Sequence, residues 1–299
     1  MNIIEVMRRW PDQDNAMEHL EKVRWGDRPI CPYCKSDHVG IHASKDKKAP
    51  RWQCYACTRA FSATVHTIFH HTHLPLRTWF LALVIMLNAK KNVSNRQLAR
   101  DLGLPYKTAW SLGLRIRQAM LTDPAQKRLF MGIVEMDESY VGGKPRKGNK
   151  RKDDKPSKRG RGTKKMPVVG IVERNGRAVA KVVDKSMLTM DGLKQFYLRF
   201  ADPKASIVMT DEFAGYGGLK DITRHYAVNH NVAYVSGDTH INTIEGFWAS
   251  IKRSWYGQHH HYSRKWADHY ISEVSFKYNN RENPNVFNDL LRHMVGVAA

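Results

Sequence analysis

The stretch Met131-Gly132-Ile133-Val134-Glu135-Met136-Asp137, residues 131–137, is a short apolar run that ends in an acid, and it decides the fold. Its composition predicts a buried β-strand with Asp137 at the end. Two further runs, Pro167–Glu173 and Arg177–Val183, are joined through Asn175-Gly176, a dipeptide that tolerates the positive φ angles of a type I′ hairpin turn. The three runs therefore predict the first three strands of a sheet.

The sequence after these strands alternates helical and extended segments. We expect a helix from about Thr189 to Phe200, a strand from Ala205 to Thr210, and a long helix from about Asn242 to Trp255. Three strands, a helix, a strand and further α/β units are the order of a ribonuclease H-like core. The fold class predicted for this half is therefore α/β (α+β).

Three acids stand where these predicted elements could bring them together. Asp137 ends the first strand, Asp211 follows the fourth, and Glu245 lies on the late helix. Carboxylates crowded into one cleft repel each other, so such a set makes sense chiefly when divalent cations neutralise it. Oxygen ligands favour Mg²⁺ or Mn²⁺, and two such ions would support an in-line displacement at phosphorus. The acids therefore indicate metal-dependent cleavage and joining of phosphodiesters.

Residues near Glu245 favour this set of acids. Lys252 follows Glu245 by seven residues, about two helical turns, so its ammonium could hold a substrate phosphate beside the metals. Arg253 adds a second cation at the same place. Phe247 and Trp248, on the same helix, are expected in the core.

Other acids lie close by and compete for the role. Because a strand directs alternate side chains to opposite faces, Glu138 directly after Asp137 is expected to point elsewhere, and so is Glu212 after Asp211. Glu135 shares the strand face of Asp137. The full set of competitors is Glu135, Glu138, Glu212 and Asp238.

All four cysteines lie within one window of 27 residues. They form two CxxC pairs, Cys31 with Cys34 and Cys54 with Cys57, with nineteen residues between the pairs. This is the spacing of a zinc ribbon, in which four thiolates complete a closed tetrahedral shell around one structural Zn²⁺. The alternatives are four unrelated thiols, or histidine ligands drawn from His38, His42, His66, His70, His71 and His73.

Three consecutive helices are expected after the ribbon. Apolar residues from Leu76 to about Asn88 recur at helical spacing, a second helix runs from the N-cap Ser94 to Gly103, and a third from Lys107 to Met120. Helix, glycine-containing turn and basic helix are the layout of a helix-turn-helix, although plain packing also produces such pairs. The residues expected to face a DNA groove and its phosphates are Lys107, Thr108, Trp110, Ser111, Arg115 and Arg117.

The charge of the chain predicts a polyanionic partner. Its 299 residues contain 49 Lys plus Arg against 28 Asp plus Glu, which gives a formal net charge of +21 at pH 7. Twelve basic residues and two acids fall between Lys144 and Lys165, in an insert that cannot pack a core. A solvated loop is the plain interpretation. We favour a clamp on DNA phosphates beside Asp137, with Lys144, Arg146 and Lys147 among the contacts.

The length and hydropathy of the chain indicate how many domains to expect and whether a segment could cross a membrane. The chain exceeds a typical domain of about 100 to 200 residues, so we expect units at 1–73 with the ribbon, 74–125 with the helix-turn-helix and 126–299 with the ribonuclease H-like core. The longest apolar run, Trp79 to Leu87, has nine residues, short of the ~20 that cross a bilayer, and no signal-peptide run opens the chain. We expect a cytoplasmic protein with no membrane partner.

Several blocks of sequence together resemble a known family. The blocks are the ribbon pairs CPYC and CYAC, the helical segment LARDLG…KTAW, and VEMDESYVGGK, MTDEFAGY, HINTIEGFWASIKR and FKYNNRE. From about residue 10 to residue 290 the chain resembles the bacterial insertion-sequence transposases that combine a zinc-ribbon amino terminus with a DDE core. Matched motif by motif, the resemblance implies that the metal-binding acids are Asp137, Asp211 and Glu245, followed by Lys252. In part of that group an asparagine is the third ligand, and Asn242 stands one turn before Glu245.

The resemblance also implies a reaction and partners. Such a protein binds double-stranded DNA at terminal inverted repeats, nicks it with metal-activated water, and joins the freed 3′ hydroxyl to target DNA. Two element ends require a homodimer or a higher assembly, and the bacterial nucleoid is its place of action. The alternatives are a zinc-ribbon and helix-turn-helix DNA-binding regulator whose α/β half is inactive or oligomerises, and a structure-selective nuclease on the same fold.

Overall fold

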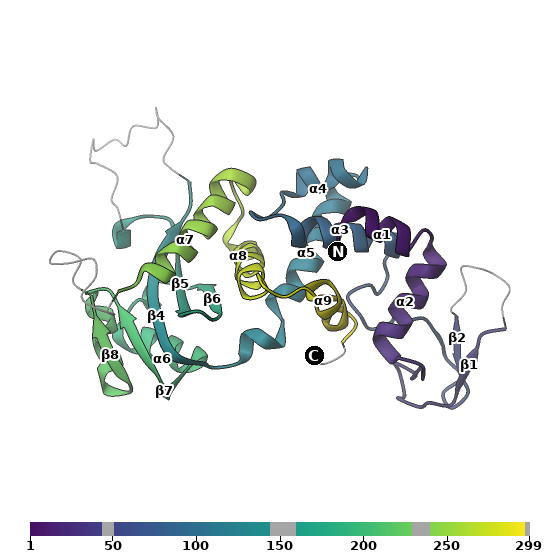
Figure 1. Cartoon of the computed structure of the whole chain (residues 1–299), viewed down its shortest axis with the longest axis horizontal. Coiled ribbons are helices and arrows are strands. Elements are labelled where there is room, and N and C mark those ends of the chain that lie inside the picture. The colour runs from purple at the N-terminus through teal and green to yellow at the C-terminus, as the bar shows by residue number, and fades with distance from the viewer. Residues whose placement is uncertain (44–50, 144–159, 229–239, 297–299) are drawn as a thin grey trace. The chain divides into compact units, whose positions relative to one another are not determined.

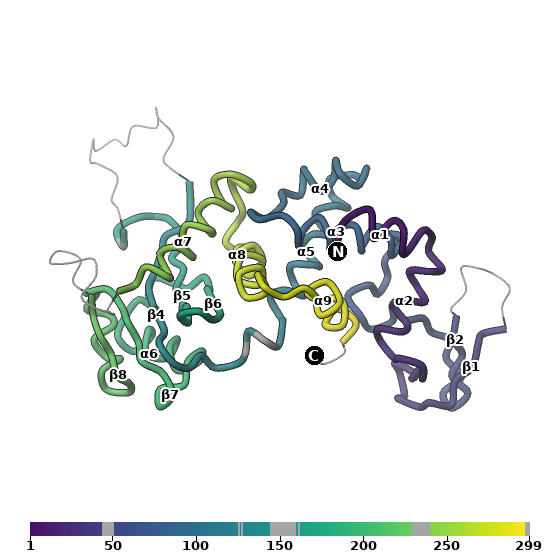
Figure 2. Tube along the Cα trace, in the orientation of Figure 1, coloured from purple at the N-terminus to yellow at the C-terminus, as the bar shows by residue number. Residues whose placement is uncertain are grey.

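The computed structural model describes residues 1–43, 51–143, 160–228 and 240–296, and the other residues are drawn in grey in Figures 1 and 2. The chain forms two compact units. The first contains Met1–Lys90, Asn95–Pro124 and Asn283–Ala299, and the second contains Lys91–Ser94 and Ala125–Glu282. The predicted region 126–299 differs from this division at its end, because the last helix packs into the first unit.

The first unit begins with two short helices and a small antiparallel sheet. Helix α1 (Ile3–Arg9) and helix α2 (Gln13–Trp25) precede the sheet, whose strand order is β1-β2-β3. The strands are β1 (Val39–Ile41), β2 (Trp52–Cys54) and β3 (Ala60–Phe61), so β2 leads into the second cysteine pair and β3 follows it.

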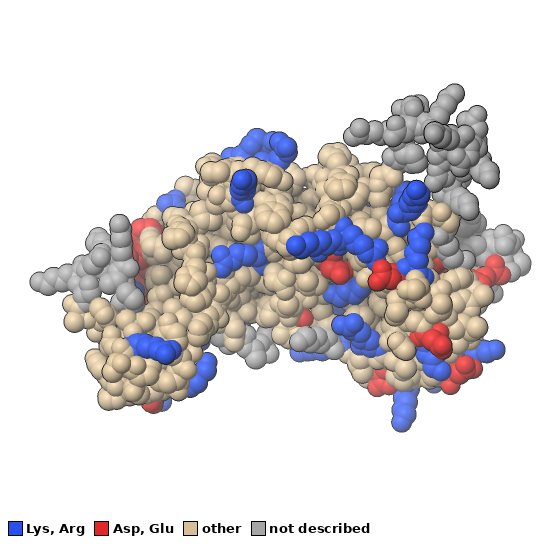
Figure 3. Space-filling view, turned by 180° about the vertical axis from the view of Figure 1, so that it is seen from behind, with Lys and Arg blue, Asp and Glu red and all other residues tan. Residues whose placement is uncertain are grey.

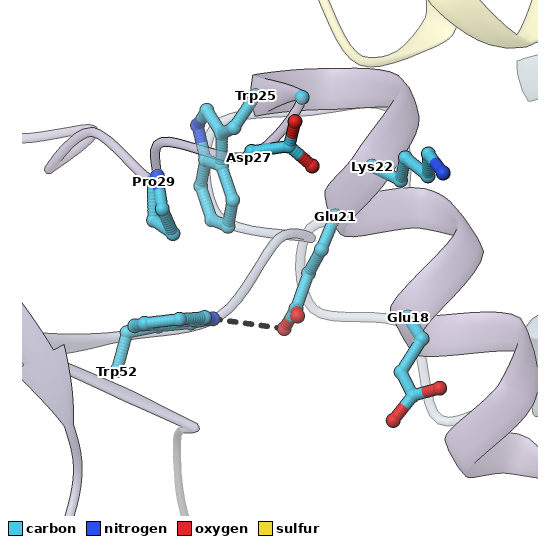
Figure 4. A pocket seen from close by; sticks show the side chains of 8 residues that line it. Glu18, Glu21, Lys22, Trp25, Asp27, Pro29 and Trp52 are labelled. Atoms are coloured by element: carbon cyan, nitrogen blue, oxygen red, sulfur yellow. Dashed lines mark hydrogen bonds between the residues drawn. The ribbon is translucent and has the colours of Figure 1, made fainter.

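Helix α2 packs against this sheet through side chains that Figure 4 shows. The Trp52 indole nitrogen donates to Glu21 Oε1 over 2.9 Å, beside the ring of Trp25. Arg24 Nη1 donates to two backbone carbonyls after β3, those of Ala63 and Val65, at 2.8 and 2.7 Å. These contacts hold the sheet on one helix, which matters because so small a sheet buries little apolar surface of its own.

Four further helices belong to the described part of the first unit. They are α3 (Leu76–Asn88), α4 (Asn95–Leu102), α5 (Tyr106–Leu121) and α9 (Val286–Met294). The first three match the predicted helices to within one residue at every end. Helix α9 joins them through Phe287, whose ring stacks on Trp10 with centroids 5.6 Å apart and meets Phe80 edge-on.

The second unit is built on a mixed sheet of five strands in the order β6-β5-β4-β7-β8. Strand β4 pairs antiparallel with β5 and parallel with β7, which in turn is parallel to β8. This is the ribonuclease H-like arrangement that the element order predicts. The strand bounds are β4 (Phe130–Val141), β5 (Met166–Glu173), β6 (Ala178–Val182), β7 (Ala201–Thr210) and β8 (Arg224–Ala227).

Helices cover both faces of this sheet (Figure 1). Helix α6 (Met190–Phe200), whose N-cap Thr189 accepts a hydrogen bond from the Gly192 amide, packs on one face. Helices α7 (Asn242–Ser254) and α8 (Arg264–Asn279) pack on the other face. The predicted helices from Thr189 and from Asn242 are therefore confirmed, with a π-helical turn Trp255–His259 after α7.

Two details differ from the sequence prediction. Strand β4 continues to Val141, because its pairing with β5 extends as far as Val141 opposite Met166, so Asp137 lies inside the strand and not at its end. In the hairpin between β5 and β6 only Asn175, with φ 57°, adopts a positive φ, so the turn is not of type I′. The preceding Arg174 donates its amide to Ile133 of β4 and turns its side chain toward Glu135.

Candidate functional site

The four cysteine sulfurs converge as one group. Their Sγ atoms all lie within 4.8 Å of one another, with Cys31 and Cys57 3.7 Å apart and Cys34 and Cys54 3.6 Å apart. A disulfide needs about 2.05 Å, so these are free thiols. A tetrahedral Zn²⁺ with bonds of about 2.3 Å separates its ligands by about 3.8 Å, close to the distances seen. The group therefore fits one closed, structural zinc ion.

Backbone hydrogen bonds and sharp turns around each CxxC pair direct the four cysteine side chains toward one point. The amide of Lys35 donates to the Cys31 carbonyl at 3.0 Å, and the amide of Cys54 donates to the Arg59 carbonyl at 2.9 Å. Lys35 and Thr58, which directly follow the two pairs, adopt φ angles of 65° and 59°, so the chain turns sharply after each knuckle. Among the described residues, no group that could hold a metal ion includes a histidine, which disfavours the histidine alternatives.

The parallel pairing of β4 with β7 brings two of the predicted acids together. Their register aligns Glu135 with Met209, so Asp137 and Asp211 each lie two residues beyond a paired position. Strand β7 ends at Thr210, and Asp211 turns there, its Oδ1 accepting the Phe213 amide over 3.0 Å. Asp137 and Asp211 therefore meet at the end of β7, as the sequence predicts, although β4 itself runs on.

A third carboxylate in this group is one that sequence reasoning placed elsewhere. Glu138 offers an oxygen within 4.8 Å of those of Asp137 and Asp211, so the expectation that it points elsewhere is wrong. Alternation does put Glu138 on the α6 face, where the buried Tyr216 hydroxyl donates to its Oε2 over 2.8 Å. Since β7 has already ended beside it, both neighbouring side chains approach the same open edge. Tyr216 lies in the MTDEFAGY block, the one signal that could have indicated this contact.

Asp137 lies in an environment that resists its ionisation. Burial, and then the charges of Glu138 and Asp211, raise the pKa of Asp137 from 3.8 to about 7. Two donors oppose this rise: the Trp248 indole nitrogen 2.9 Å from Oδ2, and the Glu138 amide 2.8 Å from Oδ1. Carboxylate oxygens gathered this closely suit a hard divalent cation such as Mg²⁺ or Mn²⁺. The acids present therefore fit the metal site that the sequence predicts.

Helix α7 carries the third predicted acid toward this group without adding it to the cluster. Trp248, which contacts Asp137, lies one helical turn after Glu245, so the two side chains are neighbours on the helix surface. Glu245 and Asn242 are both exposed, and among the described residues neither joins the acids within 4.8 Å. Lys252 is exposed one turn beyond Trp248, with Arg253 beside it. Trp248 and Phe247 are buried, as predicted, but the contact of Trp248 with Asp137 was missed.

The other competing acids have different surroundings. Glu212 is exposed, as expected for a residue directed away from the cluster. Glu135 is fully buried and bound to Arg174, so it is occupied in the core beneath the site. Asp238 falls outside the described residues.

The residues predicted to contact DNA divide into exposed and buried ones. Lys107 and Ser111 are exposed on α5, and Thr108 and Trp110 are partly exposed. Arg115 is partly buried, donating to the His70 carbonyl over 2.9 Å and lying over the Trp79 ring.

Arg117 requires a correction. It has no exposed surface, and its Nη1 donates to Asn95 Oδ1 over 2.8 Å between α4 and α5. Its guanidinium therefore holds two helices together and does not face a DNA groove. Gly113, one turn earlier, leaves the space, since a Cβ there would lie 2.9 Å from Arg117 Nη1. A glycine one turn before an arginine on the apolar face was the signal available in the sequence.

Basic side chains are spread widely over the described surface. Figure 3 shows Lys and Arg at many places on one face of the chain, with fewer Asp and Glu among them. The predicted clamp residues Lys144, Arg146 and Lys147 lie outside the described residues, as does most of the basic insert 144–165. No helix in the described part of the chain has the length and apolar character needed to pass through a lipid bilayer.

Comparison with known proteins places this architecture in one class. Residues 11–60 match the transposase zinc-ribbon domain, and residues 130–279 match the ISXO2-like transposase domain, a DDE domain. The chain is 31% identical over 266 residues to an uncharacterized protein in transposable element ISH50 of Halobacterium salinarum, an alignment that covers 85% of this chain and 86% of the relative. No solved structure matches the chain.

The fold and the site thus define a zinc-ribbon transposase with a DDE domain on a ribonuclease H-like sheet. More narrowly, the chain belongs to the family of ISXO2-like transposases.

Proposed function

We propose that this transposase binds the inverted repeats at the ends of its element and catalyses metal-dependent cleavage and strand transfer of that DNA. The proposed ligands of the catalytic ions are Asp137, Asp211 and Glu245. The observation that carries the proposal is the meeting of Asp137 and Asp211 at the end of β7, where burial, and then the charges of Glu138 and Asp211, raise the pKa of Asp137 to about 7. Such a strongly perturbed acid in an open cluster favours a functional role over a structural one.

The residues of the chain have distinct tasks in this reaction. Trp248 and the Glu138 amide orient the carboxylate of Asp137, and the Phe213 amide orients that of Asp211. Bound divalent ions, two per site, supply the Lewis acidity that activates the attacking oxygen and stabilises the leaving one. Lys252 and Arg253, exposed on α7 beyond Trp248, hold the substrate phosphate backbone near these acids.

The remaining parts serve DNA binding. The zinc ribbon and the helices α4 and α5 recognise the element ends, with Lys107, Thr108 and Trp110 as the proposed contacts. Two ends must be brought together, so the active form is at least a homodimer on DNA. Its substrate places the protein at the nucleoid.

The test is an assay of labelled duplexes that carry the element's terminal repeats, with Mg²⁺ and a target plasmid. Wild type should nick the end and join it to target DNA, and Asp137→Ala with Asp211→Ala should do neither. Glu212→Gln is the matched control, because this exposed acid adjoins Asp211 without joining the cluster. Cleavage equal in wild type and the double variant overturns the enzyme assignment in favour of a DNA-binding regulator. Cleavage without joining indicates a nuclease.

A further inference from the structure

Glu135 is a fully buried carboxylate that contacts four groups from two other segments of the second unit, one of them His240 Nδ1, which lies 3.4 Å from its Oε1. Its Oε1 lies 2.8 Å from Arg174 Nε, in the hairpin after β5, and 2.9 Å from the Thr243 hydroxyl. Its Oε2 accepts the backbone amide of Ile244 over 2.9 Å. A carboxylate so completely buried is tolerated only when it is paired and hydrogen-bonded, and Glu135 meets both conditions.

The two groups from α7 belong to the first turn of that helix. Helix α7 begins at Asn242, and its N-cap residue Ile241 provides no side-chain hydrogen bond. The first amides of a helix need acceptors, and a negative charge there also interacts favourably with the helix dipole. Glu135 meets both needs from strand β4, so a strand side chain caps this helix.

Arg174, in the hairpin after β5, also holds Glu135 and the start of α7 in place. Arg174 binds Glu135 through Nε, and its Nη2 donates to the carbonyl of His240 over 2.8 Å, just before α7. The Arg174 amide is bound to Ile133 on β4. One arginine thus ties the strand that carries Asp137 to the segment that leads into α7.

The position of this anchor relates it to the proposed metal ligands. Glu135 precedes Asp137 by two residues on the same face of β4, and Ile244 directly precedes Glu245 on α7. The hydrogen bond between Glu135 and the Ile244 amide therefore lies close in the chain to both Asp137 and Glu245. It limits how far the first turn of α7 can move relative to β4.

We infer that Glu135 is a positioning residue, which caps helix α7 from strand β4 and so sets the distance between Asp137 and Glu245. This inference rests on the proposed function, because it concerns how that site is assembled. Glu135 itself touches neither metal nor DNA and acts through α7. A purely structural ion pair would contribute to stability but would leave the metal affinity of the folded protein unchanged.

The test uses the full chain loaded with zinc and two variants of the anchor. Glu135→Gln removes the negative charge of the anchor. Thr243→Val removes one hydrogen bond to Glu135 but leaves the Glu135–Arg174 ion pair intact, so this variant is used if Glu135→Gln does not fold. Asp184→Asn is the matched control, because it removes the carboxylate of an exposed carboxylate–arginine pair, Asp184 with Arg264 at 2.7 Å, neither of whose residues belongs to α7. Asp137→Asn reports whether Mn²⁺ binds at the proposed site.

Two quantities are measured: Mn²⁺ affinity by calorimetry, and hydrogen exchange of the amides in the first turn of α7. We expect Mn²⁺ affinity to fall by about tenfold or more in Glu135→Gln, the range of indirect effects on metal sites, and by about two- to tenfold in Thr243→Val. First-turn amides should exchange faster in both variants. Asp184→Asn should match wild type in both measurements.

The outcomes separate this inference from the proposed function. If Asp137→Asn abolishes Mn²⁺ binding while Thr243→Val and any folded Glu135→Gln bind like wild type, the site stands and the positioning role is overturned. Faster exchange without weaker Mn²⁺ binding overturns it equally. If wild type binds no Mn²⁺ that depends on Asp137, the proposed function fails first, and the inference fails with it.

Discussion

The indole nitrogen of Trp248 donates to Asp137 Oδ2 over 2.9 Å, although the two residues are 111 positions apart in the chain. The ring can approach because Gly170, the partner of Asp137 on β5, has no side chain: a Cβ there would lie 2.8 Å from the ring edge. A helix residue therefore reaches across a strand glycine to orient the central acid of the site. The Trp248 ring therefore has two roles: it fills the core, and its indole nitrogen stabilises the ionised carboxylate of Asp137.

Replacing Trp248 with Phe should raise the pKa of Asp137 further above its usual range. The indole donor stabilises the charged form, so its loss makes deprotonation harder and metal binding weaker. We expect Mn²⁺ affinity at pH 7 to fall on the order of tenfold, with most of the loss recovered at pH 9. Calorimetry across this pH range measures the effect. Trp266→Phe, in the same apolar layer, should leave the profile unchanged, and a superimposable Trp248→Phe profile would contradict the role assigned to the indole.

Gly170→Ala tests the same contact from the sheet. The new methyl group must displace the Trp248 ring, which costs about 1 to 3 kcal/mol of unfolding free energy and weakens the bond to Asp137. Gly246→Ala on α7 is the control, because nothing lies within 4 Å of its Cβ and alanine favours a helix. Urea titrations should therefore show opposite signs for the two substitutions. Equal stability of Gly170→Ala and wild type would show that the ring has room to move.

Much of this sheet was predictable because the local spacing of apolar residues indicates strands and helices. The runs at 167–173 and 205–210 are apolar over the right length, and the residue after the second run, Asp211, necessarily leaves a strand end. The position of Glu138 was not predictable in this way. Alternation assumes a strand paired on both sides, whereas β7 ends beside Asp137 and opens the edge to both side chains. Strand lengths relative to one another are a tertiary property that no local pattern contains.

Asp137→Asn should stabilise the protein in the absence of added Mg²⁺ as the pH rises. The pKa of Asp137 is about 7 when folded and near 3.8 when unfolded, so below pH 3.8 both states are protonated and the group contributes nothing. Between these values the unfolded state releases its proton first, and above pH 7 the full penalty applies, at most about 4 kcal/mol.

The stability gained by Asp137→Asn over wild type should therefore grow from about pH 4 to pH 7 and then level off. Urea titrations at a series of pH values measure this difference. Added Mg²⁺ should reverse the order at pH 8, because only wild type keeps the ligand. A variant that gains no stability between pH 4.5 and pH 8 would show that burial and the neighbouring carboxylates do not raise the pKa of Asp137.

Two basic residues of helix α5 should respond in opposite ways to alanine. Lys107 is exposed, so Lys107→Ala should weaken duplex DNA binding and reduce the slope of log affinity against log salt by about 1, without changing stability. Arg117 is buried against Asn95, so Arg117→Ala should lower the unfolding free energy by about 2 kcal/mol and leave the salt slope unchanged. DNA titrations at several salt concentrations separate the two. A lower salt slope in Arg117→Ala would restore the role in DNA contact first predicted for it.

Cys34→Ser should remove the zinc ion and unfold the ribbon while the ribonuclease H-like sheet stays folded. The described residues of the ribbon include few buried apolar side chains, chiefly Phe61 and Val65 around the cysteines, so we expect metal binding to supply most of its folding free energy. Wild type should contain one zinc per chain, and Cys34→Ser should lose it and become sensitive to proteolysis before residue 70. His38→Ala distinguishes the ligand sets, since four thiolates leave no place for an imidazole. Zinc retained by Cys34→Ser would show that Cys34 is not an essential ligand, and zinc lost from His38→Ala would mean that a histidine completes the site.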